Sequence, residues 1–320
     1  MTHMGRIKIA VLGAGNIGTA MAHVLACKGH EVSIWDFFPE VVTDIRLHRK
    51  NSRFLPRVCL HDGVCATSDA GECVTDAALV VIGVPSLFIS STLAPVVPAL
   101  MNSAVLLNLA KGFAPQTRQL PSFLMGRLAP GHSCVHLAGP AIANELARGL
   151  PAAVVLAAKD DRIAERVASW LAGPTLLVST TTDVTGAAIG GILKNVYAIL
   201  LGCLETLTGG ARNLEAAALN ASIHEMATIA RAHGGQESTL YGLAGLGDLV
   251  ATGFSRDSHN RRFGQSLASG KMAAEIAEEM RVLPEGVRTA TAACGLARAG
   301  KVRAPLARLV SRWIDGVPPS

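Results

Sequence analysis

One lysine lies in the middle of a helical stretch that is otherwise apolar enough to be buried. The stretch from Gly186 to Gly202 reads GAAIGGILKNVYAILLG, with Lys194 and Asn195 near its middle. Loss of water around an ammonium group lowers its pKa toward neutrality, as a proton donor to a carbonyl oxygen requires. Hydride addition to a ketone leaves an alkoxide, which such an ammonium would stabilise and protonate. The alternative is a structural lysine whose ammonium extends to the surface, and helical periodicity alone favours neither.

Asp248 and Lys111 are candidates for the same chemistry. Asp248 lies in the glycine-rich stretch GLAGLGDLVATG, residues 242–253, where its carboxylate could hold and orient a lysine ammonium. Its alternative role is to cap a helix that begins at Leu249. Lys111 lies in the stretch LAKGF, directly after an apolar strand. There it would point toward a ligand at the carboxyl end of a parallel sheet, although an ordinary solvated loop lysine is an equal alternative.

The stretch GAGNIG, residues 13–18, fits the G-x-G-x-x-G pattern, follows a strand and precedes a helix. Gly13 permits the tight turn, Gly15 lets backbone N–H groups approach a pyrophosphate, and Gly18 lets helix and strand pack closely. The helix N-terminus would carry partial positive charge toward the phosphates. The alternative is a glycine-rich turn that binds nothing.

Asp36 ends the next strand, about 20 residues beyond these glycines, where an acidic residue accepts hydrogen bonds from the ribose hydroxyls. A carboxylate there would also repel a 2′-phosphate. The sequence therefore favours NAD over NADP as the cofactor.

The glycine turn, Asp36 and Lys111 would all lie at the ends of strands, so a sheet is needed to bring them together. Short apolar runs do alternate with helical patterns through the first half of the chain. The expected strands are residues 7–13, 31–36, 78–84, 104–110, 133–139, 152–158 and 175–180. Near-continuous apolar strands separated by helices indicate a parallel sheet covered on both faces. We therefore expect residues 1–180 to form an α/β, Rossmann-like dinucleotide-binding domain with a mostly parallel, doubly wound sheet.

From about residue 182 the apolar residues recur at helical spacing, and no strand-like run interrupts them. After the helix that carries Lys194, further helices are expected at residues 214–232, 258–268, 273–280 and 287–299. The helix of Lys194 approaches the length of a membrane span. A charge near its centre, with no neighbouring span to shelter it, favours a buried helix instead. Residues 181–320 are thus expected to form an all-α substrate and catalytic domain.

Composition narrows the partners of this 320-residue chain. The net charge is +5, and the basic residues are scattered, which favours anionic small molecules over nucleic acid. The seven cysteines include no C-x-x-C pair, and the N-terminus lacks the zones of a signal peptide. We therefore expect free thiols in a reducing cytoplasm, no metal site, no membrane partner and a small-molecule substrate.

Several motifs appear in one order along nearly the whole chain: GAGNIGTAMA, LAKGF, AGPAIANELARGLPAAVVLA, GGILKNVYAI, GLAGLGDLVATG, SHNRRFG and PEGVRTA. The run AGPAIANELARGLP, residues 138–151, and the Lys-Asn-Val helix are far more specific than the glycine pattern. With these motifs the chain resembles the NAD-dependent glycerol-3-phosphate dehydrogenase family of the bacterial type.

The resemblance implies hydride transfer between NAD and C2 of a glycerol phosphate, with dihydroxyacetone phosphate as the ketone. Lys194 would be the proton donor or acceptor, and Lys111 and Asp248 would complete the catalytic site. The implied cofactor-binding residues are Gly13, Gly15, Asn16, Ile17, Gly18, Asp36, Pro85, Lys111, Ala143 and Glu285. The implied substrate-binding residues are Lys111, Gly139, Lys194, Asn195, Asp248, Thr252, Ser258, His259 and Asn260. An enzyme of glycerophospholipid biosynthesis, acting as a homodimer, is expected.

Of the several departures from the family pattern, one bears directly on the substrate. Where the family has Ser-Arg-Asn, this chain has Ser258, His259 and Asn260. The missing arginine is the one that the family places against the substrate phosphate, and losing a bidentate phosphate contact costs roughly 2–4 kcal/mol. Arg256 and Arg262 are candidates to replace it. The alternative function is therefore a dehydrogenase of the same fold that acts on a different small hydroxy compound.

Overall fold

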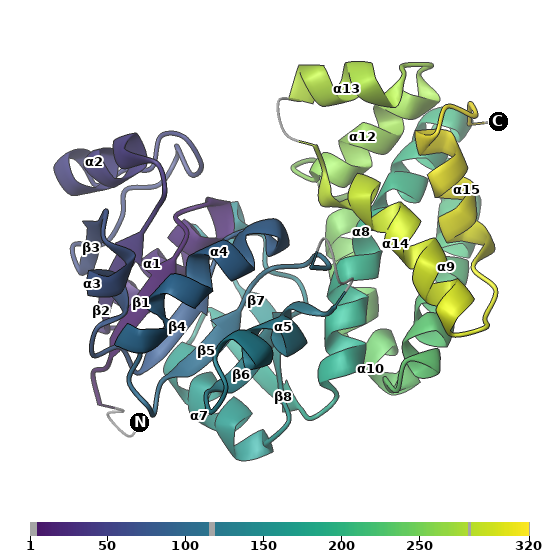
Figure 1. Cartoon of the computed structure of the whole chain (residues 1–320). Coiled ribbons are helices and arrows are strands. Elements are labelled where there is room, and N and C mark those ends of the chain that lie inside the picture. The colour runs from purple at the N-terminus through teal and green to yellow at the C-terminus, as the bar shows by residue number, and fades with distance from the viewer. Residues whose placement is uncertain (1–4, 115–118, 281–282, 320) are drawn as a thin grey trace. The chain divides into compact units, whose positions relative to one another are not determined.

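The computed structural model describes residues 5–114, 119–280 and 283–319. The chain forms two compact units, residues 1–184 and 185–320 (Figure 1). Each unit is described below by itself.

The first unit is built on an eight-stranded sheet in the order β3-β2-β1-β4-β5-β6-β7-β8. The strands are β1 (Lys8–Leu12), β2 (Glu31–Trp35), β3 (Val64–Thr67), β4 (Leu79–Ile82), β5 (Val105–Asn108), β6 (Ser133–Ala138), β7 (Ala152–Ala158) and β8 (Leu176–Thr181). Every pairing is parallel except that of β6 with β7. The expected α/β fold with a mostly parallel sheet is confirmed. The strand order reverses beside β1, which pairs with both β2 and β4, and ligands of such sheets bind at this switch point.

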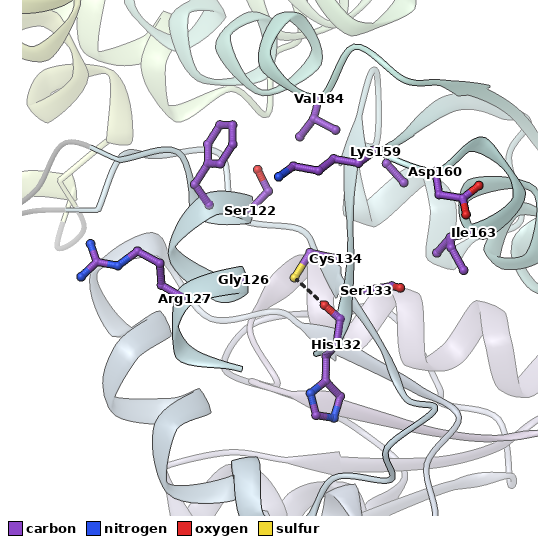
Figure 2. A pocket seen from close by; sticks show the side chains of 12 residues that line it. Ser122, Gly126, Arg127, His132, Ser133, Cys134, Lys159, Asp160, Ile163 and Val184 are labelled. Atoms are coloured by element: carbon purple, nitrogen blue, oxygen red, sulfur yellow. Dashed lines mark hydrogen bonds between the residues drawn. The ribbon is translucent and has the colours of Figure 1, made fainter. Parts of the chain in front are cut away.

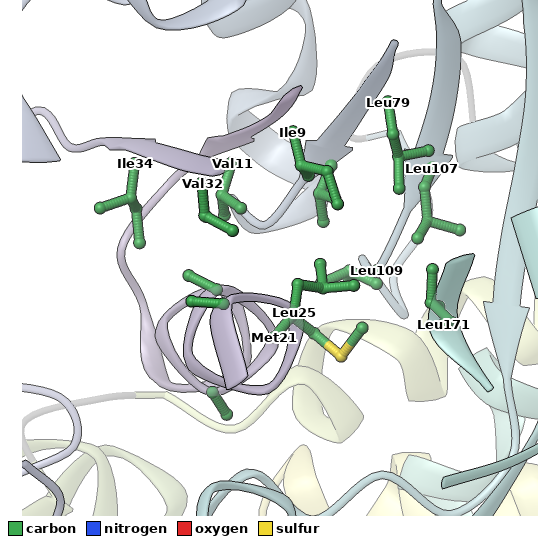
Figure 3. Close-up of a cluster of buried hydrophobic side chains, with 14 of the residues drawn as sticks. Ile9, Val11, Met21, Leu25, Val32, Ile34, Leu79, Leu107, Leu109 and Leu171 are labelled. Carbon is green, nitrogen blue, oxygen red and sulfur yellow. The ribbon is translucent and has the colours of Figure 1, made fainter. Parts of the chain in front are cut away.

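Helices cover both faces of the sheet. They are α1 (Asn16–Cys27), α2 (Pro39–His48), α3 (Ala70–Val74), α4 (Ile89–Leu93), α5 (Pro121–Leu128), α6 (Ala143–Ala147) and α7 (Asp161–Leu171), with 3₁₀ turns at Ser86–Phe88 and Ala94–Ala99. Successive side chains of β1 alternate between two cores, because strand side chains point to opposite faces. Ile9 and Val11 pack in the core that includes Met21 and Leu25 of α1 (Figure 3). Ala10 and Leu12 belong to the core on the other face.

The sequence prediction missed β3. This strand has only four residues, and it lies at the edge of the sheet, where it pairs with β2 alone. Its apolar pattern is too short to separate it from a loop, so its pairing is decided by the neighbouring strand.

The second unit is helical, as expected. Its helices are α8 (Val184–Thr208), α9 (Arg212–Ala232), α10 (Glu237–Tyr241), α11 (Asp248–Phe254), α12 (His259–Ala268), α13 (Ala273–Met280), α14 (Glu285–Ala299) and α15 (Pro305–Ile314), with a π-helical turn at Leu243–Gly247. The prediction missed α10 and α15. The N-terminus of α15 has no capping side chain of its own. Instead Glu225 of α9 accepts hydrogen bonds from the N–H groups of Leu306 and Ala307. Because Glu225 lies 81 and 82 residues before them in the chain, no local sequence pattern marks the start of this helix.

Glycines on α8 and α12 bring the helices of the second unit into close contact. A Cβ atom at Gly190 would lie 2.4 Å from the carbonyl oxygen of Ala244, and one at Gly202 would lie 2.1 Å from that of Arg261. A Cβ atom at Gly264 of α12 would likewise lie 2.1 Å from the carbonyl oxygen of Ile199 of α8. These close approaches place the π-helical turn and α12 directly against α8, on either side of Lys194 and Asn195 in the sequence.

Among the described residues, α8 alone has the length and composition of a membrane-crossing helix. The structure buries 94% of its most apolar window inside the protein, as in the core helix of a globular unit.

Candidate active site

The three glycines of the turn after β1 meet three different surroundings. Gly13 has a φ of +107°, and a Cβ atom there would lie 2.8 Å from the backbone nitrogen of Val84. A Cβ atom at Gly18 would lie 2.0 Å from the carbonyl oxygen of Gly13, so α1 packs on the turn only without a side chain. At Gly15 the nearest atom would be 3.8 Å away, the carbonyl oxygen of Gly83. The protein itself therefore leaves Gly15 uncrowded, and its backbone can be approached by a ligand.

The N-terminus of α1 suits a pyrophosphate. Its N-cap is Gly15, which supplies no capping side chain, and the first turn carries no acidic residue. Unsatisfied N–H groups and the positive end of the helix dipole make such a terminus an anion site. Asn16 of this turn donates a hydrogen bond to the carbonyl oxygen of Phe54 at 2.7 Å, and Ile17 packs against the core. The residues present fit a dinucleotide cofactor.

Asp36 supports the same turn. Its carboxylate accepts hydrogen bonds from the N–H groups of Ala14 at 2.7 Å and Phe38 at 3.0 Å, and the residue is only 9% exposed. A carboxylate has about four acceptor positions, so two remain for ribose hydroxyls. Asp36 therefore has a structural role that the sequence did not indicate, beside the predicted ribose contact.

Asn51 is a further support that sequence reasoning missed. This fully buried amide donates to the carbonyl oxygen of Ala14 at 2.7 Å and to the hydroxyl of Thr19 at 2.8 Å. It stands 32 residues or more from both partners in the chain and belongs to no motif. Nothing in the sequence alone marks it.

Lys111 joins the loops that follow two adjacent strands. It lies after β5, and its ammonium donates a hydrogen bond to the carbonyl oxygen of Gly139, after β6, at 2.9 Å. Lys111 is therefore held at the carboxyl end of the sheet and is not an ordinary solvated lysine. Pro85 is exposed after β4, and Ala143 is buried at the start of α6.

In the second unit, Lys194 is 7% exposed, so the alternative of a lysine that extends to the surface is wrong. Its ammonium contacts the carboxylate of Asp248 and donates to the hydroxyl of Thr252 at 2.7 Å. Asp248 is 1% exposed and is itself the first residue of α11, so it does not cap a helix that begins at Leu249. An ammonium is buried at tolerable cost only when a paired charge and hydrogen bonds compensate it. The carboxylate of Asp248 and the hydroxyl of Thr252 together hold the nitrogen of Lys194 in one orientation.

Asn195, next to Lys194, meets a different set of partners. Its side-chain oxygen accepts a hydrogen bond from Asn260 of α12 at 3.0 Å, and Asn260 in turn accepts from the N–H of Gly286 at 2.9 Å. Gly286 follows Glu285, the first residue of α14. A Cβ atom at Gly286 would lie 2.6 Å from the side-chain oxygen of Asn260, so this junction requires glycine. Asn195, Asn260 and the start of α14 thus form one buried cluster.

The start of α12 carries the residues that replace the Ser-Arg-Asn motif. The hydroxyl of Ser258 caps the helix by accepting from the N–H of Arg261 at 3.2 Å. Loss of solvent and the nearby charge of Arg262 lower the pKa of His259 below its ordinary value of 6.5, against a smaller opposing effect of Asp257. The guanidinium of Arg262 lies 3.3 Å from Nδ1 of His259. His259 therefore takes up a proton less readily than an ordinary histidine, and the permanent charge beside it is that of Arg262. Arg261 instead pairs with Glu205.

A doubly wound sheet with a glycine turn at its switch point, followed by a helical unit with a buried lysine–aspartate pair, defines a nicotinamide-dependent dehydrogenase. Residues 8–164 match the family model of the NAD-dependent glycerol-3-phosphate dehydrogenase N-terminus, and residues 183–317 match that of its C-terminus. The chain belongs to this family.

Curated relatives agree over nearly the full length. The glycerol-3-phosphate dehydrogenase [NAD(P)+] of Geobacter sp. (strain M21) is 37% identical over 302 residues, which cover 93% of this chain and 90% of that protein. The enzyme of the same name from Moorella thermoacetica is 39% identical over 298 residues, 93% of this chain and 88% of the relative. A crystal structure of glycerol-3-phosphate dehydrogenase from Coxiella burnetii superimposes with a TM-score of 0.92 at 30% identity and covers 98% of this chain and 96% of its own.

Proposed function

We propose that this protein interconverts dihydroxyacetone phosphate and sn-glycerol 3-phosphate with NAD(H). The observation that carries the proposal is the buried ammonium of Lys194, which Asp248 and Thr252 hold in one orientation. Family membership and the names of the relatives support the same reaction. The alternative, a different small hydroxy compound, is not favoured by these comparisons.

The nicotinamide, when bound, supplies or accepts the hydride at C2. In reduction, Nζ of Lys194 donates a proton to the carbonyl oxygen as that oxygen becomes an alkoxide. The carboxylate of Asp248 orients the ammonium and stabilises its charge before the transfer, and the hydroxyl of Thr252 restrains its rotation. In oxidation, the same nitrogen accepts the hydroxyl proton. An oriented charge in a dry site stabilises the developing alkoxide more strongly than water does.

The remaining residues divide between the two ligands. We propose that the turn of Gly13, Gly15 and Gly18 binds the pyrophosphate, and that Asp36 favours NAD through the ribose. The other proposed cofactor contacts are Asn16, Ile17, Pro85, Lys111, Ala143 and Glu285. The proposed substrate contacts besides Lys194, Asp248 and Thr252 are Lys111, Gly139, Asn195, Ser258, His259 and Asn260.

We also propose that the protein works in the cytoplasm, as a homodimer, and that its product enters glycerophospholipid synthesis. The seven cysteines are all free thiols, which fits a reducing compartment. The dimer rests on the family resemblance, and light scattering of the purified protein tests it.

The reaction is tested by NADH oxidation with a panel of ketones at neutral pH. Dihydroxyacetone phosphate should give rapid turnover, and dihydroxyacetone, which lacks the phosphate, should give a much lower kcat/KM. Turnover of another ketone without turnover of dihydroxyacetone phosphate would establish the alternative. NADH binding without turnover of any ketone would contradict a dehydrogenase.

A further inference from the structure

The first unit contains a cavity of about 430 Å³ whose lining includes none of the residues assigned to the reaction. Its walls come from α5, the start of β6 and the junction from the end of β7 into α7, together with Val184, the last residue of the first unit (Figure 2). A cavity of this size can hold a small organic molecule.

The cavity lies at the opposite end of the sheet from the glycine turn. Ser133 and Cys134, which line it, begin β6, whereas Gly139 follows the other end of that strand. Because β7 runs antiparallel to β6, its last residue, Ala158, returns to the same end. Since β6 is linked to β1 through parallel pairings, the carboxyl ends that form the cofactor crevice lie at the far edge. The cavity is therefore a separate place in the fold.

Ser122 marks this cavity as a polar site. The residue is only 7% exposed, yet its hydroxyl has no hydrogen-bond partner among the described residues. Buried hydroxyls are nearly always satisfied, and an exception calls for a missing partner. Figure 2 shows the hydroxyl of Ser122 directed into the cavity, toward the end of the Lys159 side chain. A ligand acceptor placed between the two would satisfy both.

The charge of the cavity favours an anion. Lys159 supplies a cationic side chain beside Ser122, and Arg127 adds a second positive charge to the lining, although its guanidinium donates to Gln119. Among the described lining residues, Asp160 alone carries a carboxylate. Asp160 is already committed, because it caps α7 and accepts two hydrogen bonds from the side chain of Arg162. Burial raises the pKa of the Cys134 thiol to about 11, against a lowering effect of Lys159, so the thiol adds no negative charge at neutral pH.

The rest of the lining is apolar. Phe123, Ile163 and Val184 contribute hydrophobic surface, and the ammonium of Lys159 lies 5.6 Å from the centre of the Phe123 ring. A ligand that suits both halves of the lining carries an acidic group and a compact hydrophobic part.

We propose that this cavity binds a small organic anion, with a carboxylate or phosphate group between Ser122 and Lys159 and a hydrophobic part against Phe123, Ile163 and Val184. The hydroxyl of Ser122 donates a hydrogen bond to the acidic group, and Lys159 neutralises its charge. Charge-assisted hydrogen bonds of this kind are among the strongest that a protein makes.

The test uses the full chain with methyl-labelled isoleucine and follows the Ile163 methyl signal by NMR. The probes are benzoate and phenyl phosphate, with benzyl alcohol as the neutral match. We expect one or both anions to shift the Ile163 signal and the alcohol to leave it in place; the stronger anion identifies the acidic group. Equal shifts with the alcohol, or no shift with either anion, would overturn the proposal.

Two variants locate the binding. Lys159→Met and Ser122→Ala should each raise the Kd of the preferred anion by roughly tenfold, whereas Lys50→Met, at an exposed lysine of the same unit, should not change it. The methyl signal of Ile17 reports on the glycine turn. If Ile17 shifts while Ile163 does not, the anion binds at the cofactor turn and the proposed cavity site is wrong.

Discussion

The glycine turn of the first unit and the lysine cluster of the second are built in opposite ways. At the turn, side chains are excluded: Gly13 and Gly18 have no room for a Cβ atom, and Gly15 presents bare backbone. In the cluster, three side chains from two helices meet, and Lys194 stands 54 residues from Asp248. The turn offers backbone N–H groups to a ligand, whereas the cluster fixes the position of one side chain, the ammonium of Lys194.

Because of this difference, the two sites should be sensitive to different substitutions. Adding a single carbon should damage the turn, either by colliding with the backbone at Gly18 or by standing in the way of a ligand at Gly15. Removing a single charge should damage the cluster, because its partner would remain buried and unpaired. The following predictions test the contrast, from the largest expected effect to the smallest.

Replacing the lysine should give the largest loss. Lys194→Met should lower kcat by roughly 10²–10⁴-fold, since it removes the proton donor, while the Kd of NADH, measured by fluorescence, should stay nearly unchanged. The exposed Lys271→Met serves as the control. Substantial residual turnover would show that another group moves the proton.

The same position separates activity from stability. Lys194→Met leaves Asp248 buried without its counter-charge, which costs roughly 3–5 kcal/mol of unfolding free energy. Adding Asp248→Asn should restore much of the melting temperature without restoring kcat. Recovery of both would mean that the single variant was inactive only because it was unfolded.

Two alanine substitutions should divide the glycine turn into a binding part and a packing part. Gly15→Ala should raise the Kd of NADH at least about tenfold, because weakened phosphate contacts are worth roughly 1.5–3 kcal/mol, and it should leave the melting temperature unchanged. Gly15 has a φ of −65°, which alanine adopts without strain. Gly18→Ala should instead lower the melting temperature, since its Cβ would lie 2.0 Å from a carbonyl oxygen. Equal effects of the two variants on stability would contradict this division.

Replacing the carboxylate beside the turn should change the cofactor preference. Asp36→Ser should raise the ratio of kcat/KM for NADPH to that for NADH by roughly tenfold, because it removes the repulsion of a 2′-phosphate. Asp62→Ser, at an exposed aspartate of the same unit, is the matched control. An unchanged ratio would leave Asp36 with only its structural hydrogen bonds to Ala14 and Phe38.

The smallest effect is expected at the start of α12. His259→Arg should lower the KM for dihydroxyacetone phosphate by roughly three- to fivefold by adding a permanent charge. Because the pKa of His259 lies below 6.5, the wild-type ring gains its charge only as the pH falls below that value. The ratio of the wild-type KM to the variant KM should therefore decrease from pH 7.5 to pH 5.5. A ratio independent of pH would place His259 away from the phosphate.

Much of the first unit could be read from its sequence. Seven of its strands were predicted because each is a nearly continuous apolar run, and the glycine turn because its parts lie within six consecutive residues. The edge strand β3 was missed because four residues carry too little pattern. Asn51 was missed because its partners, Ala14 and Thr19, are brought to it only by folding.

In the second unit, the sequence predicted the helices but left the role of Lys194 open. An apolar helix with one lysine is compatible both with a buried charge and with a surface one, because the period of a helix does not say what faces it. The contacts of α8 with α11 decided the matter, by bringing Asp248 and Thr252 to the ammonium.

By itself, the amino-acid sequence determined the fold class, because apolar periodicity separates strands from helices, and the family, because its motifs follow one another in order along the chain. The glycine turn could also be found from the sequence, because its parts lie within six consecutive residues. The tertiary structure alone decided that Lys194 pairs with Asp248, that Asn195 meets Asn260 of α12, and that a separate cavity with cationic side chains lies at the other end of the sheet. The reason is that burial and pairing are properties of side chains far apart in the chain, and no local pattern records the partner that folding supplies.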